Sequence, residues 1–212
     1  MLAKIFQILI YWPIFLGLRF FTRFEIQGQE NLIGLEKKPV IFAVGPHCSY
    51  IDGPIFAAAM PRQGFSPRDF FPVRFLCIAR YFSWKYILIP IFLFLTGTLK
   101  VVRSGGDLEK SLAEPIKVLK NSSAKICIFP EGKLSSDGKL QQGKRGTVYL
   151  FQQTGAIIVP AVFVGNFKIL SIKTLFRTKK LKVILGKPLF HLTGTLENMT
   201  EQIMREIGKL SY

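Results

Sequence analysis

The stretch PVIFAVGPHCSYID, residues 39–52, joins an apolar run to a polar turn and then to the start of a helix. Pro39 to Val44 is short, continuous and apolar, which is typical of a strand buried on both faces. Residues Pro54 to Met60 place a proline early and alanines after it, which predicts a helix. A buried strand that leads through a turn into a helix is the first half of a βαβ unit.

The rest of the chain repeats this alternation. The segment after residue 106 shows it most clearly, because Leu108, Leu112 and Ile116 recur at helical spacing. The sequence therefore predicts an α/β fold with a mostly parallel central sheet flanked by helices, and ligands in such sheets bind beyond the carboxyl ends of the strands. Further strands are expected at Arg74–Ala79, Thr98–Val102, Ala124–Phe129, Ile157–Val164 and Leu181–Leu185, and helices at Asp107–Leu119, Lys144–Gln153 and Leu196–Leu210.

Composition points to an acidic, lipid-like partner. The chain has 212 residues, 29 basic against 13 acidic side chains, and a net charge of +16. Such an excess favours nucleic acid, an anionic membrane surface or a phosphate-bearing substrate. A hydrophobic share of 49% and 20 phenylalanines favour the lipid options over nucleic acid. Cys48, Cys77 and Cys127 match no zinc spacing, so we expect free thiols in a reducing compartment and no metal or cofactor.

The N-terminus is strongly apolar. Ile5 to Leu18 is interrupted by Gln7 and Pro13 alone. As a helix these residues reach only about 21 Å, against roughly 30 Å for the hydrocarbon core of a bilayer. We therefore expect one helix, or two kinked at Pro13, lying at the membrane interface in one leaflet, although an ordinary buried helix is the alternative. This gives a membrane-associating segment at residues 1–24 and a domain at residues 25–212.

His47 and Asp52 carry the most specific chemistry. Residues five apart lie about 140° apart on one helix, so they can meet only if His47 sits in the turn and Asp52 in the first helical turn. Asp52 would then accept the Nδ1 proton of His47, fix its tautomer and stabilise the imidazolium. His47 would act as a general base on a substrate hydroxyl. The alternatives are a helix-capping Asp52 beside a structural histidine, and Cys48 acting as a nucleophile.

Four short motifs follow one another in a fixed order over roughly residues 25–190, after a lead-in segment. The lead-in and the motifs are Glu25–Leu32, His47-x4-Asp52, Val101-Val102-Arg103, Phe129-Pro130-Glu131-Gly132 and Ile158-Val159-Pro160. Together they resemble the glycerolipid acyltransferase family, whose first motif is HX4D, and most closely its bacterial lysophosphatidic acid branch.

The resemblance implies a reaction and a set of partners. It implies transfer of a fatty acyl group from acyl-CoA or acyl carrier protein to the free hydroxyl of a lysophospholipid, with lysophosphatidic acid giving phosphatidic acid. It implies an enzyme at a membrane, on the cytoplasmic face of the inner or plasma membrane, without nucleic acid. The catalytic residues would be His47 and Asp52, and the substrate-binding residues Arg103, Glu131, Gly132, Lys133 and Lys144.

Two departures from the family pattern bear on the acceptor. Lys133-Leu134 stands where Thr-Arg is usual, and a lysine does not reproduce the bidentate fork of an arginine. Pro46 replaces the common asparagine before the histidine. Another lysolipid acceptor thus remains an alternative, and from another class, a non-enzymatic basic module that binds membranes peripherally.

Two further segments have open interpretations. The apolar run Tyr86–Leu99 either lines an acyl-chain pocket or fills the core. Residues 168–187 hold seven basic side chains and no acid, which indicates either a solvated face or a dock for an anionic membrane or an acidic carrier protein.

Overall fold

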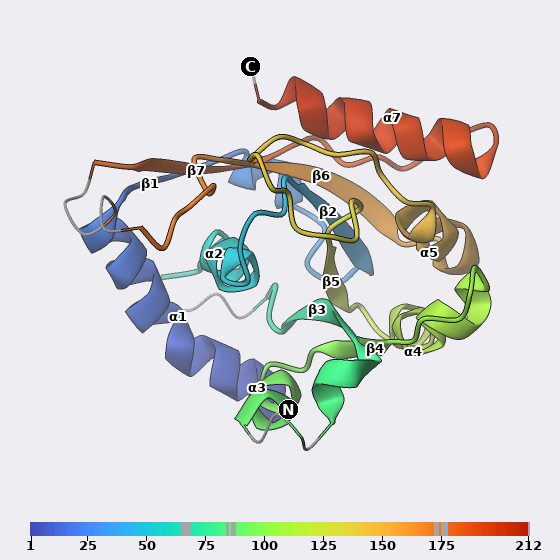
Figure 1. Ribbon diagram of the computed structural model, residues 1–212, viewed down its shortest axis with the longest axis horizontal. Coiled ribbons are helices and arrows are strands. Elements are labelled where there is room, and N and C mark those ends of the chain that lie inside the picture. The colour runs from blue at the N-terminus through green and yellow to red at the C-terminus, as the bar shows by residue number, and fades with distance from the viewer. Residues whose placement is uncertain (65–68, 84, 86–87, 172–173, 175–177, 212) are drawn as a thin grey trace.

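The sheet is built outward from β2 (Val40–Gly45), the strand formed by the apolar run before His47 (Figure 1). The structure is a computed structural model, and it describes residues 1–64, 69–83, 85, 88–171, 174 and 178–211. Seven strands form one sheet in the order β1-β7-β6-β2-β5-β3-β4. The other strands are β1 (Arg23–Gln27), β3 (Val73–Ile78), β4 (Leu99–Val101), β5 (Lys125–Ile128), β6 (Ile157–Val164) and β7 (Lys180–Leu185).

The predicted mostly parallel sheet is confirmed, because every strand pair is parallel except β6 with β7. Strand β1, at the edge of the sheet, was not expected from the sequence. Its five residues alternate exposed charged or polar side chains with Phe24 and Ile26, which is a weak signal in so short a segment. The boundary expected between residues 24 and 25 lies within this strand.

The two faces of the sheet pack against different helices. Val40, Phe42 and Val44 point into a layer shared with α1 (Leu2–Phe21) and α2 (Asp52–Ala58). Ile41 and Ala43 point into the opposite layer. Because β2 is buried on both faces, its sequence is continuously apolar. Figure 1 shows α1 and α2 on one side of the sheet and α7 (Leu196–Lys209) on the other. The described residues also form helices α3 (Leu88–Leu95), α4 (Leu108–Asn121) and α5 (Gly146–Thr154), and short 3-10 turns η1 (Gln29–Leu32) and η2 (Ala79–Phe82).

Helix α1 is longer than the sequence suggested. It runs without a break through Pro13 for 20 residues. Its length of about 30 Å at 1.5 Å per residue matches the hydrocarbon core of a bilayer, so the expectation that it is too short to span was wrong. Among the described residues it is the one helix long and apolar enough to cross a membrane. Arg19, which ends the apolar run of the sequence, continues the helix, and its guanidinium lies over the Phe15 ring at 5.4 Å.

One face of α1 is fixed to the domain by a buried amide. Gln7 donates to the carbonyls of Val73 (2.8 Å) and Thr96 (2.7 Å) and accepts from the amide of Val73 (2.9 Å). The side chain is fully hydrogen-bonded, as a buried amide must be to avoid a large desolvation cost. Tyr11 and Phe15, further along the same face, are buried and their rings stack. The helix is therefore part of the packed structure.

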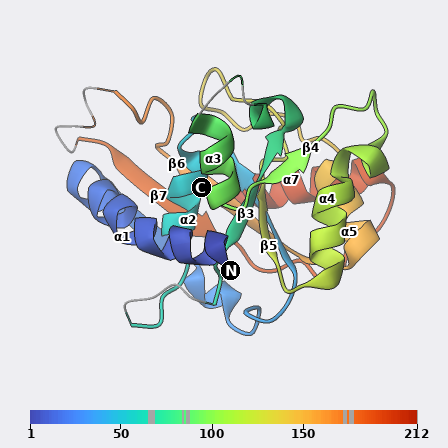
Figure 2. The ribbon, with the colours of Figure 1, turned by 90° about the horizontal axis from the view of Figure 1, so that it is seen from below.

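The outward sides of α1 and α3 together form an apolar surface. The two helices lie beside each other in Figure 2, and the rings of Phe6 and Phe92 meet edge to face at 6.4 Å. Helix α3 does not fill the core, because its buried side chain is that of Pro90. Of the run expected at Tyr86–Leu99, the first two residues lie outside the described residues. The most exposed members of this apolar surface are Leu9, Leu16, Phe20, Leu88 and Phe94, each at least 57% exposed.

Candidate active site

His47 and Asp52 meet at the carboxyl end of β2. His47 lies in the turn after the strand, and Asp52 is the first residue of α2. The Nδ1 atom of His47 lies 2.9 Å from Oδ2 of Asp52. The Asp52 side chain is fully buried, whereas that of His47 is 20% exposed. With Nδ1 donating to the carboxylate, Nε2 is the nitrogen left free to take a proton.

The Asp52 carboxylate is surrounded by donors. Its Oδ2 atom also accepts from the amides of Cys48 (2.6 Å) and Ser49 (2.8 Å). Its Oδ1 atom accepts from Nδ2 of Asn166 (3.2 Å), which comes from the loop after β6. An ionised carboxylate offers acceptors only, so the charged form satisfies all four contacts. These contacts fix the Asp52 carboxylate so that Oδ2 stays against the His47 imidazole.

Besides its contact with Asp52, the His47 imidazole ring packs against an aromatic ring. It stacks on Phe129, with ring centroids 3.9 Å apart and planes 8° from parallel. Below the turn, the fully buried Glu131 accepts from the amide of His47 (2.9 Å) and from the amide of Gln141 (3.1 Å). Burial raises the pKa of Glu131, and these hydrogen bonds oppose the rise. Both of its carboxylate oxygens hold backbone, which gives Glu131 a positioning role in this geometry.

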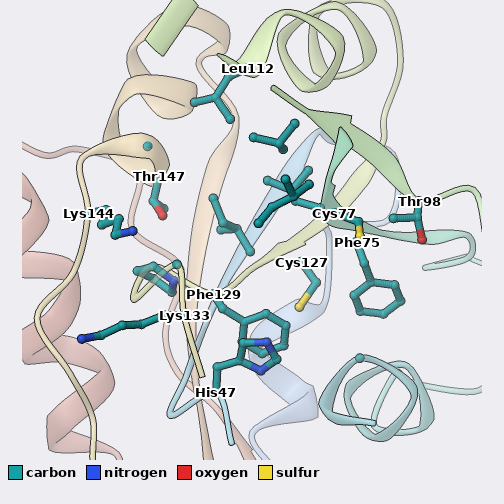
Figure 3. Close-up of a pocket in the computed structure, with 18 of the residues that line it drawn as sticks. His47, Phe75, Cys77, Thr98, Leu112, Cys127, Phe129, Lys133, Lys144 and Thr147 are labelled. Carbon is teal, nitrogen blue, oxygen red and sulfur yellow. The ribbon is translucent and has the colours of Figure 1, made fainter. Parts of the chain in front are cut away.

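His47 opens onto a cavity of about 1420 Å³. This is larger than the roughly 300–1,000 Å³ typical of small-molecule sites. Apolar walls come from α1, α2 and α3, including Ile10, Tyr11 and Phe92. In Figure 3 His47 lies between Lys133 and Lys144 on one side and Phe75, Cys77 and Thr98 on the other. The cavity therefore has an apolar part and a cationic part, with the imidazole between them.

The structure brings the remaining predicted site residues, apart from buried Glu131, into this cavity. Arg103, from the loop after β4, lines it together with Gly132, Lys133 and Lys144. Figure 3 shows the ammonium of Lys144 turned into the cavity, while Lys133 extends away from His47 toward α7. Gly132 has a left-handed backbone (φ +62°), and a Cβ there would come within 3.1 Å of the Lys144 ammonium.

The thiols do not behave as nucleophiles in this arrangement. Burial and the nearby Asp52 charge raise the pKa of Cys48 to about 11. Burial raises the pKa of Cys127, on the cavity wall, well above its usual value. A thiol is nucleophilic as the thiolate, so both are poorly reactive near neutral pH. Within the described residues there is also no cluster of three His, Cys, Asp or Glu side chains able to hold a metal ion.

Sequence reasoning missed two polar residues at the site. Asn166 follows β6 by two residues, so its position beyond the carboxyl end of a parallel strand was a usable signal. Its amide bridges Asp52 and the carbonyl of Pro46 (2.9 Å). Thr147, in the first turn of α5, lines the cavity with its hydroxyl buried, and nothing in its sequence context distinguishes it from an ordinary helical threonine.

The fold and this geometry define an α/β scaffold that carries a hydrogen-bonded histidine–carboxylate pair beside a cavity with apolar and cationic walls. The profile of the family described as Acyltransferase matches residues 23–164, which is more than half of the chain. The chain therefore belongs to the Acyltransferase family.

Several proteins of known sequence or structure are similar. The 1-acyl-sn-glycerol-3-phosphate acyltransferase of Bacillus subtilis (strain 168) is 38% identical over 108 residues, covering 47% of this chain and 51% of that protein. The chloroplastic BAT2 enzyme of Brassica napus, with the same description, is 27% identical over 179 residues, covering 80% of this chain and 46% of its own length. The chain thus spans about half the length of the curated relatives it matches.

A solved structure has the same fold. It is PlsC, the 1-acyl-sn-glycerophosphate (LPA) acyltransferase of Thermotoga maritima, with a TM-score of 0.67 over 95% of this chain and 78% of that one. At 17% sequence identity this likeness supports the fold alone.

Proposed function

We propose that this chain is an O-acyltransferase that moves a fatty acyl group from a thioester onto the free hydroxyl of lysophosphatidic acid, giving phosphatidic acid. The observation that carries the proposal is the His47 imidazole, backed by the buried Asp52 and open to a cavity with cationic and apolar walls. Family membership and the activity named for the relatives support it.

The residues account for each proton in the transfer. Nε2 of His47 takes the proton of the acceptor hydroxyl while its oxygen attacks the thioester carbonyl. Asp52 stabilises the imidazolium that forms. The tetrahedral intermediate then expels the thiolate, which receives the proton back from His47. An ester bond forms and a thioester bond breaks, and no enzyme nucleophile takes part.

The cavity walls suit the two substrates. Arg103, on the cationic part, can form charge-assisted hydrogen bonds to the acceptor phosphate. Lys133 extends the same positive part of the cavity, and Gly132 leaves room beside it for the Lys144 side chain. The apolar part, bounded by α1 and α3, takes acyl chain. The donor thioester is acyl-CoA or acyl carrier protein, and both are acidic molecules that suit the basic surface.

The proposed membrane contact is the apolar surface of α1 and α3. Both helices expose large hydrophobic side chains on one side and line the cavity on the other. A lysolipid in the adjoining leaflet would therefore reach the cavity without leaving an apolar environment. Gln7 ties α1 to the domain, which favours a helix lying in one leaflet. The free thiols fit the reducing, cytoplasmic side of the membrane.

A thioester-dependent assay tests this proposal. The purified protein is given vesicles containing lysophosphatidic acid, with acyl-CoA or acylated carrier protein as donor. We expect stoichiometric phosphatidic acid and free thiol. Monoacylglycerol and lysophosphatidylcholine serve as comparison acceptors, and greater turnover with either would assign another acceptor. Vesicle binding without turnover on any acceptor would instead support the non-enzymatic membrane module.

A further inference from the structure

The first turn of α5 opens onto the same cavity as His47. Four consecutive residues, 144–147, line the cavity there. The helix begins at Gly146, its N-cap Arg145 makes no side-chain capping hydrogen bond, and the first turn contains no acidic residue. The first amides of a helix lack partners within the helix, and the helix dipole makes this end positive. An anion at this end of α5 could accept hydrogen bonds from backbone amides that no capping side chain binds.

The buried hydroxyl of Thr147 is an independent indication of a polar ligand at this position. Its side chain is 1% exposed, and among the described residues its Oγ1 is the buried side-chain atom without a hydrogen-bond partner. Thr147 is the second residue of α5, so the residue four positions earlier lies outside the helix and offers no helical carbonyl to its hydroxyl. Figure 3 shows this hydroxyl in the cavity.

Lys144 completes a set of three donor types. Its amide is bound to the carbonyl of Pro130 (2.7 Å), which fixes the start of α5 against the end of β5. Its ammonium lies over Gly132 and points into the cavity. Because Gly132 has no side chain, the lysine can occupy this position. Backbone amides, a hydroxyl and an ammonium group therefore converge on one part of the cavity wall.

We infer that the first turn of α5, with Thr147 and Lys144, is a phosphate-binding subsite that holds the phosphate monoester of the acceptor. This inference rests on the proposed function. Three donors of these types match the oxygens of a doubly charged phosphate.

The kinetic test measures how removing the Thr147 hydroxyl changes the KM for the acceptor. Thr147→Val removes the hydroxyl at nearly constant volume, Thr147→Ser keeps it, and Thr154→Val removes a hydroxyl from the same helix outside the cavity. For Thr147→Val we expect the KM for lysophosphatidic acid to rise about tenfold or more, as for loss of one hydrogen bond to a charged group, with the donor KM within about twofold of wild type. Thr147→Ser and Thr154→Val should keep the wild-type acceptor KM.

Two results would overturn the assignment. An unchanged acceptor KM in Thr147→Val would show that the hydroxyl binds no acceptor phosphate. A rise confined to the donor KM would place the phosphates of a pantetheine thioester at this subsite instead. Monoacylglycerol, which lacks the phosphate, is a further arm, since its turnover should be the same in wild type and Thr147→Val.

A binding measurement separates the subsite from the reaction. Melting temperatures are compared with and without sn-glycerol 3-phosphate, at constant ionic strength set with sodium chloride. We expect a ligand-induced rise in wild type and a smaller one in Thr147→Val. Without ligand, Thr147→Val should melt no lower than wild type, because it loses an unpartnered buried hydroxyl. Binding of sn-glycerol 3-phosphate without any turnover would reject the proposed reaction and leave the subsite standing. Turnover together with equal ligand-induced melting shifts in wild type and Thr147→Val would reject the subsite and leave the proposed reaction standing.

Discussion

Replacing Asp52 with asparagine removes one charge from behind His47 at almost constant volume. Oδ2 of Asp52 accepts from Nδ1 of His47 (2.9 Å) and from the amides of Cys48 (2.6 Å) and Ser49 (2.8 Å). An amide nitrogen cannot accept, so the asparagine must keep its oxygen there and turn its nitrogen toward Nδ2 of Asn166, which loses the 3.2 Å hydrogen bond that Oδ1 accepts. The imidazole tautomer and the turn should therefore survive, and the missing charge becomes the main change.

The size of the effect follows from the 2.9 Å contact. Coulomb's law with an effective dielectric constant of about 20 gives roughly 6 kcal/mol for opposite charges at that separation, as an upper limit. Exchanging a charge-assisted hydrogen bond for a neutral one gives a lower limit of about 1–1.5 kcal/mol. Each 1.4 kcal/mol is a factor of ten in rate. We therefore expect kcat to fall by between about tenfold and 10⁴-fold, with little change in acceptor KM.

The assay compares purified wild type, Asp52→Asn and Asp107→Asn. Asp107 is the N-cap of α4 and accepts from the amide of Lys110 (3.0 Å), and asparagine caps a helix as well as aspartate does. Formation of phosphatidic acid gives kcat and KM, and thermal melting reports folding. If folded Asp52→Asn retained kcat within about threefold of wild type, the carboxylate would not stabilise a charged imidazole during turnover, and the proposed base mechanism would be refuted.

Three other perturbations probe the phosphate contact, the membrane surface and a buried charge. Arg103→Ala should raise the KM for lysophosphatidic acid by a factor equivalent to about 1.5–3 kcal/mol and leave the donor KM unchanged, in the same steady-state assay. The double variant Leu9→Glu and Leu16→Glu should lose vesicle binding at about 1 M salt in a flotation assay, whereas wild type should stay bound because apolar insertion is not screened. Burial lowers the pKa of Lys125 to about 8, below the roughly 10.4 of an unfolded lysine. Between pH 8 and about 10.4 the unfolded chain therefore binds more protons than the folded protein. Wild type should accordingly gain up to about 1.4 kcal/mol of unfolding free energy per pH unit from pH 8 to 10 relative to Lys125→Met, and a flat difference in urea unfolding would contradict this.

Substitutions on the outer side of α1 test the anchor better than deletion of the helix. Tyr11 and Phe15 belong to the core, and Gln7 bonds to the start of β3. Deleting α1 would therefore expose the core and confuse unfolding with loss of membrane contact. Leu9 and Leu16 are 68% and 57% exposed, so glutamate at these positions changes the surface alone.

The sequence predicted the parts of the site that are local in the chain. His47 and Asp52 lie on either side of one strand-to-helix turn, so spacing and element type allowed their contact, and the resemblance to a known family favoured it over a simple helix cap. Asn166 was not predictable in the same way, because its partner Asp52 is 114 residues away. The unpartnered state of Thr147 is likewise a property of packing: it depends on how the start of α5 meets the cavity.

For the fold as well, the features with a strong local sequence pattern were predicted and those that depend on packing were not. Continuous apolar runs predicted the central strands correctly because burial on both faces leaves a strong pattern. The edge strand β1 was missed because only Phe24 is fully buried in its five residues. The apolar run predicts too short a helix because Arg19 interrupts it, whereas on the exposed face of α1 this arginine packs over a ring and continues the helix.

The most direct test of the central claim is the rate of phosphatidic acid formation by His47→Ala, measured beside His191→Ala. His191 is the other histidine of the chain and is exposed, so its substitution controls for loss of an imidazole as such. Loss of a general base should lower kcat by about 10²–10⁴-fold in His47→Ala, while His191→Ala should match wild type. A folded His47→Ala protein that forms phosphatidic acid at a near-wild-type rate would contradict the account.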